Sequence, residues 1–119
     1  MIRLRVVLAS LLAFSALTFG VASAADPSQK IHYYGLAGSS CATWLSSSEY
    51  QLGGEQWIFG FWSGLNQEAA IHNERSDVGK TTDRNGIVGE VKKVCLREPS
   101  KQLKDAAGLV FYEFQRSGR

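Results

Sequence analysis

The stretch EQWIFGFWSGLNQEAA, residues 55–70, carries the widest apolar pattern of the chain and decides the fold. Trp57 and Phe61 recur at helical spacing on one strip, and Ile58 and Trp62 recur on the strip beside it. The short aromatic run is also compatible with a buried strand, but its continuation to residue 70 favours a helix. Because the combined apolar face is wide, we expect this helix to be the central and most buried one.

Four glycines flank or interrupt this helix. Gly53 and Gly54 stand directly before it, where we expect them to break the chain. Gly60 and Gly64 lie one turn apart inside it. Each glycine costs about 1 kcal/mol relative to alanine in a helix interior. We therefore expect Gly60 and Gly64 to allow another backbone to come close.

Further helices are predicted on both sides of the central one. A short helix at residues 41–47 follows two serines, which are good helix caps. After a polar loop at residues 71–82, a helix runs from about residue 83 to 97. Pro99 ends it, and a final helix carries an apolar stripe from residue 103 to 114. The sequence thus predicts an all-α fold, a small bundle of three main helices plus one short helix.

The first residues are typical of a secretory signal peptide. A basic start and an uncharged apolar run lead to the small-residue site Ala22-Ser23-Ala24. The run is too short and too rich in alanine and serine for a membrane span, so we expect no membrane anchor after cleavage. The predicted divisions are a cleaved signal peptide (1–24), an extended N-terminal arm (25–39) and a helical domain (40–116).

Two cysteines, Cys41 and Cys95, remain after cleavage. In an oxidising compartment outside the cytoplasm, two such cysteines most often pair, so one disulfide is expected. A metal site is the alternative, but zinc takes four ligands at short spacings, and His32 and His72 are isolated. No metal ligand set is therefore predicted.

Charge and motif content exclude several function classes. Loss of Arg3 and Arg5 with the signal peptide reduces the 13 basic residues to 11, which balance the 11 acidic ones. A neutral domain offers no basic face for nucleic acid or for an anionic membrane. Neither His32 nor His72 belongs to a recognisable catalytic arrangement. We therefore expect no catalytic residue, no cofactor and no enzyme activity.

Aromatic residues are numerous for a domain of this size, and most of them suit a core. Phe59 and one of Trp57 or Trp62 are difficult to bury in a single small bundle. A surplus apolar face indicates an interface, either with a second copy or with another protein. Small domains also expose some apolar area without a partner, so both interpretations stay open.

Several motifs resemble the HdeA-like acid-stress chaperones of the bacterial periplasm, and the likeness covers about residues 40–114. They are Ser40-Cys41-x-x-Trp44-Leu45, Phe59-Gly60-Phe61-Trp62-Ser63-Gly64-Leu65-Asn66, Ile87…Val91…Val94-Cys95 and Leu103-Lys104-Asp105. The glycine pair of the central helix and the Cys95-x-x-x-Pro99 junction are also similar to small periplasmic immunity proteins that neutralise secreted amidase toxins.

The first resemblance implies a periplasmic holdase chaperone. Such a protein is a folded homodimer at neutral pH that opens in acid and shields unfolded clients on its apolar surface. The client and dimer surface would then consist of Trp57, Phe59, Phe61, Trp62 and Leu65.

The second resemblance implies a protein that binds one specific partner through a surface formed in advance. The loop at residues 71–82 is the candidate, because its charges alternate in sign. The predicted partner loop residues are Glu74, Arg75, Asp77 and Lys80. Both hypotheses describe a protein that binds other proteins and catalyses no reaction.

Overall fold

The computed structural model describes residues 30–119. The predicted signal peptide and residues 25–29 of the predicted arm lie outside the described residues. Ile31–Arg119 form one unit. No helix among the described residues has both the length and the apolar character to cross a bilayer.

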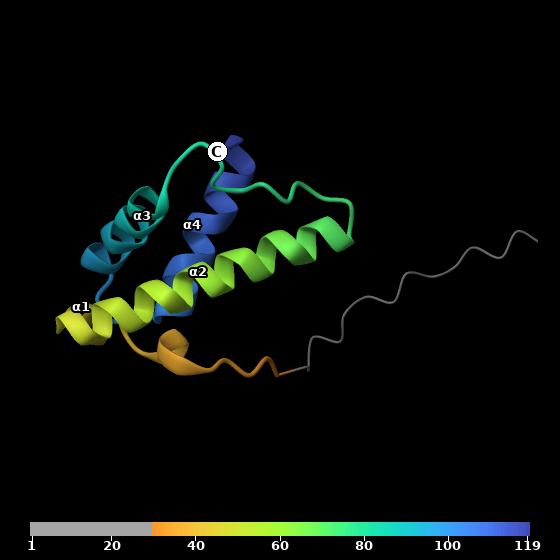
Figure 1. Cartoon of the computed structure of the whole chain (residues 1–119). Coiled ribbons are helices and arrows are strands. Elements are labelled where there is room, and N and C mark those ends of the chain that lie inside the picture. The colour runs from red at the N-terminus through yellow and green to blue at the C-terminus, as the bar shows by residue number, and fades with distance from the viewer. Residues whose placement is uncertain (1–29) are drawn as a thin grey trace, which may run out of the picture. The chain divides into compact units, whose positions relative to one another are not determined.

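Helices account for the regular structure of this unit. Figure 1 shows the longest helix, α2, crossing α4, with a short N-terminal segment running along α2. The elements are a 3₁₀ turn η1 (Gly35–Gly38), α1 (Cys41–Leu45), α2 (Ser48–Ile71), α3 (Arg84–Arg97) and α4 (Leu103–Ser117). Residues 30–119 contain no strand beyond a single bridge between Ser40 and Gln102. The predicted all-α bundle of three main helices and one short helix is confirmed.

Polar side chains start three of the helices as the sequence suggests. The hydroxyl oxygens of Ser40 and Ser47 accept hydrogen bonds from the first turns of α1 and α2. The Asp83 carboxylate accepts one from the backbone N–H of Gly86 at the start of α3. Each cap satisfies a backbone donor that would otherwise have no partner.

The expected break at Gly53 and Gly54 is wrong. Helix α2 begins at Ser48 and passes through both glycines. Gly54 is buried, and a Cβ atom added to it would lie 2.2 Å from both Cδ1 and Nε1 of Trp44. Glycine is therefore required here because the indole of α1 packs directly on the backbone of α2.

The expected close approach at Gly60 and Gly64 is also wrong. A Cβ atom added to either glycine would meet no atom within 4 Å. Both positions are exposed. The close contact of α2 with a neighbouring helix occurs six residues before Gly60, at Gly54. The arm differs too, because its residues Gly35–Gly38 form η1 and bury Ala37.

The two cysteines form the predicted disulfide. Cys41 of α1 and Cys95 of α3 are bonded, with their Cα atoms 4.9 Å apart. Their residues are 0 % and 1 % exposed. Two backbone hydrogen bonds, from the N–H groups of Cys41 and Ala42 to the carbonyls of Lys101 and Pro99, fasten the start of α1 to the segment before α4.

The core is apolar, and no charged or polar residue among those described is buried. Trp62 lies at its centre, with its ring edge-on to Phe111 at 5.1 Å and to Phe114 at 5.5 Å between centroids. Such edge-to-face pairs add to the stabilisation that area burial provides. The core thus joins α2 to α4 through aromatic contacts.

Candidate functional site

The loop between α2 and α3 is fixed to α2 by side-chain hydrogen bonds. The Asn66 side chain accepts a hydrogen bond from the N–H of Val78 and donates one to the carbonyl of Val78, both at 3.1 Å. The Trp62 Nε1–H donates to the same carbonyl at 2.8 Å. Val78 itself is buried. The middle of the loop therefore has one defined position on the folded domain.

Arg75 fastens the loop to the end of α4. Its Nη1 donates to the carbonyls of Phe114 at 3.3 Å and Gln115 at 3.2 Å, and its Nη2 donates to the carbonyl of Arg119. The last carbonyls of a helix have no partner within it, and a cation beside them also interacts favourably with the helix dipole. Arg75 was predicted as a partner-loop residue, but its guanidinium is occupied inside the domain.

Asp77 links the two cations of the loop. Its carboxylate accepts a hydrogen bond from Lys80 and another, at 2.9 Å, from the Arg75 Nε. The hydrogen bond from Lys80, and after it the one from Arg75, lowers the pKa of Asp77. Because the folded-state pKa is depressed, this contribution to stability is present above the unfolded pKa and is lost as the pH falls through the folded value.

The four predicted loop residues thus lie together but differ in availability. Arg75 caps α4, whereas Glu74, Asp77 and Lys80 are exposed. Glu74 has no Lys or Arg partner within 4 Å among residues 30–119. The loop therefore presents the Glu74 carboxylate, which is unpaired among the described residues, and the exposed Asp77–Lys80 ion pair from a backbone that is held at several points.

A groove continues from this loop between the C-terminal half of α2 and α4, and we call it the α2–α4 groove. It has a volume of about 90 Å³. Its lining residues are Leu65, Glu68, Ala69, His72, Glu74, Phe111, Tyr112 and Gln115. Glu74 belongs to both the loop and the groove, so the two features form one continuous surface.

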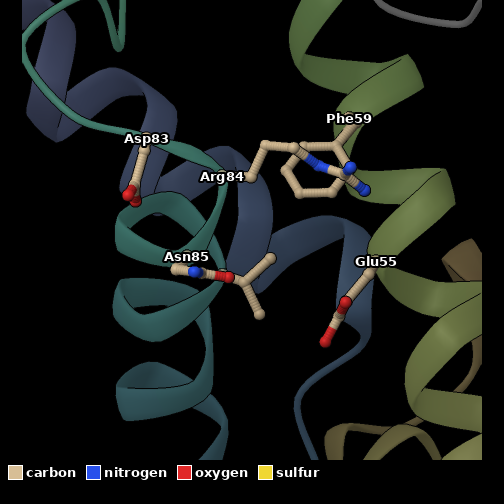
Figure 2. A pocket seen from close by; sticks show the side chains of 6 residues that line it. Glu55, Phe59, Asp83, Arg84 and Asn85 are labelled. Carbon is tan, nitrogen blue, oxygen red and sulfur yellow. The ribbon is translucent and has the colours of Figure 1, made fainter.

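A larger cavity of about 340 Å³ lies between α2 and the start of α3. Figure 2 shows Arg84 reaching from α3 across the ring of Phe59, and the guanidinium carbon is 4.5 Å from the ring centroid. Asp83 caps α3, and Glu55 lies 3.5 Å from the Nζ of Lys92. The charged groups of this cavity are thus engaged within the domain.

The five residues predicted as a client and dimer surface do not form one face. Trp62 is 4 % exposed, so a surface of the folded domain cannot include it. Its side chain is buried because the indole N–H donates to the carbonyl of Val78 and the ring fills the core. Phe59 lies under Arg84, and Leu65 lines the α2–α4 groove.

Trp57 and Phe61 form a separate pair on another side of α2. Their rings stack with centroids 4.8 Å apart, and both side chains are half-buried. Gly35 of η1 lies beside Trp57, and a Cβ atom added to it would be in ordinary van der Waals contact with the indole Cδ1, at 3.7 Å. The N-terminal segment therefore covers part of this aromatic pair.

His72 is the one predicted candidate base with a side-chain carboxylate partner. Its Nε2 lies 2.8 Å from the Glu68 carboxylate, and both side chains are exposed. Within residues 30–119, no hydroxyl or thiol group hydrogen-bonds to this pair. No group of three or more metal-ligating side chains occurs in the same part of the chain. The absence of enzyme activity stays a prediction.

Comparisons with models of protein families, with curated proteins and with solved structures find no match to this chain.

Proposed function

We propose that this protein is an exported binding protein that recognises one specific protein partner through the loop at residues 72–83. The observation that carries the proposal is the fixation of the loop by Asn66, Trp62 and Arg75. A loop that is already ordered loses little conformational freedom on binding, and this favours a specific complex. The predicted signal peptide, together with the disulfide, supports a site of action in the periplasm.

The exposed charges of the loop supply the specificity in this proposal. Glu74, Asp77 and Lys80 are held at defined positions, so a partner with complementary charges fits in one orientation. Like charges placed opposite them cost free energy, which excludes wrong partners. The proposed function needs no catalytic group from the domain.

A charge reversal in the loop tests the proposal. We expect Lys80→Glu to weaken binding of the native partner at least about tenfold, which corresponds to about 1.4 kcal/mol. The partner is captured by crosslinking from the cell envelope at pH 7, and its affinity is then measured by calorimetry with purified components.

Lys93→Glu is the matched control for this experiment. Lys93 pairs with Glu90 at a spacing of three residues, as Lys80 does with Asp77, and the two lysine side chains are 64 % and 59 % exposed. We expect the Lys93 variant to bind like the wild type. Equal affinity of both variants, each folded by circular dichroism, would contradict a role for the loop.

The acid-activated holdase is a second candidate, and the stacked pair of Trp57 and Phe61 favours it. Gly35 of η1 lies beside the Trp57 indole, so release of the η1 segment would expose more of this apolar pair. Protonation of the surface carboxylates at pH 2–3 would remove the ion pairs and leave net positive charge, which loosens a marginal fold.

Acid behaviour separates the two candidates. The holdase requires suppression of client light scattering at pH 2–3 but not at pH 7, together with apolar-dye binding and dissociation of a homodimer in acid. Our primary proposal expects a protein that stays folded and binds no dye down to about pH 3, since the core holds no charged group. Strong suppression of aggregation in acid would reverse our order of preference.

A further inference from the structure

We propose that the α2–α4 groove receives a basic and apolar segment of the partner protein. This inference rests on the proposed function, because it names the chemistry of the partner that the loop would recognise. The segment carries a Lys or Arg next to one apolar side chain. Size, floor and charge of the groove each point to this occupant.

The floor of the groove is apolar. Ala69 of α2 and Phe111 of α4 are buried at its base, Leu65 is half-buried, and Tyr112 is exposed beside them. A volume of about 90 Å³ is far below that of a small-molecule site, which is typically about 300–1,000 Å³. The space therefore suits one apolar side chain of a protein segment.

The rim of the groove is acidic. Glu68 pairs only with His72, and Glu74 has no ion-pair partner among residues 30–119. Six other described carboxylates have a Lys or Arg within 4 Å: Glu55, Asp77, Glu90, Glu98, Asp105 and Glu113. The rim thus keeps two carboxylates without a strong cation, and a partner cation placed there is electrostatically favoured.

Position supports the same occupant. Glu74 is shared by the groove and by the loop at residues 72–83, so a partner seated on the loop reaches the groove without crossing another element. The cavity between α2 and α3 is larger, but its two acidic side chains are already engaged. Asp83 caps α3, and Glu55 pairs with Lys92. The charge available to a partner is therefore on the α2–α4 side.

Three short peptides test the inference with the purified full chain by ¹⁵N NMR. They are capped Lys-Lys-Leu-Lys-Lys, the same peptide with glutamate for lysine, and the same peptide with serine for leucine. The salt is about 0.15 M, where exposed charges more than about 8 Å apart are largely screened. We expect the first peptide to shift amides of residues 65–74 and 111–115, and the other two to bind at least about tenfold more weakly.

Paired variants locate the charge effect. We expect the double variant Glu68→Gln and Glu74→Gln to raise the dissociation constant of the first peptide at least about tenfold. Glu49→Gln is the control, because Glu49 lies at the other end of α2 and also has no Lys or Arg within 4 Å among the described residues. Equal losses in both variants, or shifts outside the groove, would overturn the inference.

The failure of this inference differs from the failure of the proposed function. If Lys80→Glu abolishes partner binding while the Glu68 and Glu74 double variant keeps it, the loop function stands and the groove is excluded. If the peptide binds the groove while Lys80→Glu leaves the affinity for the partner unchanged, the groove inference stands and the proposed loop function fails.

Discussion

Gly54→Ala is expected to destabilise the domain by about 3 kcal/mol, the upper part of the usual range for overpacking. The added methyl group would lie 2.2 Å from two atoms of the Trp44 indole. Trp44 is fully buried, and its Nε1–H donates to the carbonyl of Gln51 at 3.1 Å, so the ring has no free space to move into. Either α1 separates from α2 or the helix bends, and both lose core contacts. Chemical denaturation monitored by tryptophan fluorescence measures the change in unfolding free energy.

Gly60→Ala is the matched control, since Gly60 lies in the same helix with no atom within 4 Å of an added Cβ. Alanine is the better helix former, so this variant should be more stable than the wild type by up to about 1 kcal/mol. If the changes in unfolding free energy have opposite signs in the two variants, packing against Trp44, and not helix propensity, is the reason for glycine at position 54. A neutral result for Gly54→Ala would contradict the direct contact.

The same contact explains where sequence-based prediction failed. Periodicity identified the central helix, the helix that contains Cys95 and the helix that follows it, because their apolar strips are long. It could not identify the true start of α2, since two consecutive glycines predict a break unless a large side chain occupies the space they leave. That side chain, Trp44, belongs to another helix, and pairing it with Gly54 requires the tertiary structure.

The site was predictable to a similar extent. The polar loop and its alternating charges were visible in the sequence, but the role of Arg75 was not. The carbonyls that Arg75 binds belong to residues 39 to 44 positions later in the chain. Likewise, the strips of Trp57 and Trp62 look equivalent in the sequence. Only the packing of α4 decides that Trp62 enters the core while Trp57 faces η1.

Removal of the disulfide is expected to cost about 4 kcal/mol in unfolding free energy. Cys41 and Cys95 are 54 positions apart, and in the chain-entropy model a crosslink that closes such a loop stabilises by about this amount. The free energy of unfolding of a small domain is about 5–15 kcal/mol in total. The double variant Cys41→Ala and Cys95→Ala should therefore unfold at a much lower denaturant concentration. Guanidinium titration of the oxidised wild type and the double variant gives the difference.

Reduced wild-type protein separates the crosslink from the packing of the sulfur atoms. It keeps both side chains, so a loss equal to that of the double variant assigns the effect to the crosslink, whereas a smaller loss assigns part of it to the alanine cavities. Because both cysteines are at most 1 % exposed, a thiol reductant should act only as fast as the domain opens. Rapid reduction under native conditions, or equal denaturation midpoints for oxidised wild type and double variant, would contradict this account.

The disulfide and the Trp44 contact both hold α1 in place. Combining Gly54→Ala with loss of the disulfide should therefore lower the free energy of unfolding by less than the sum of the two separate losses.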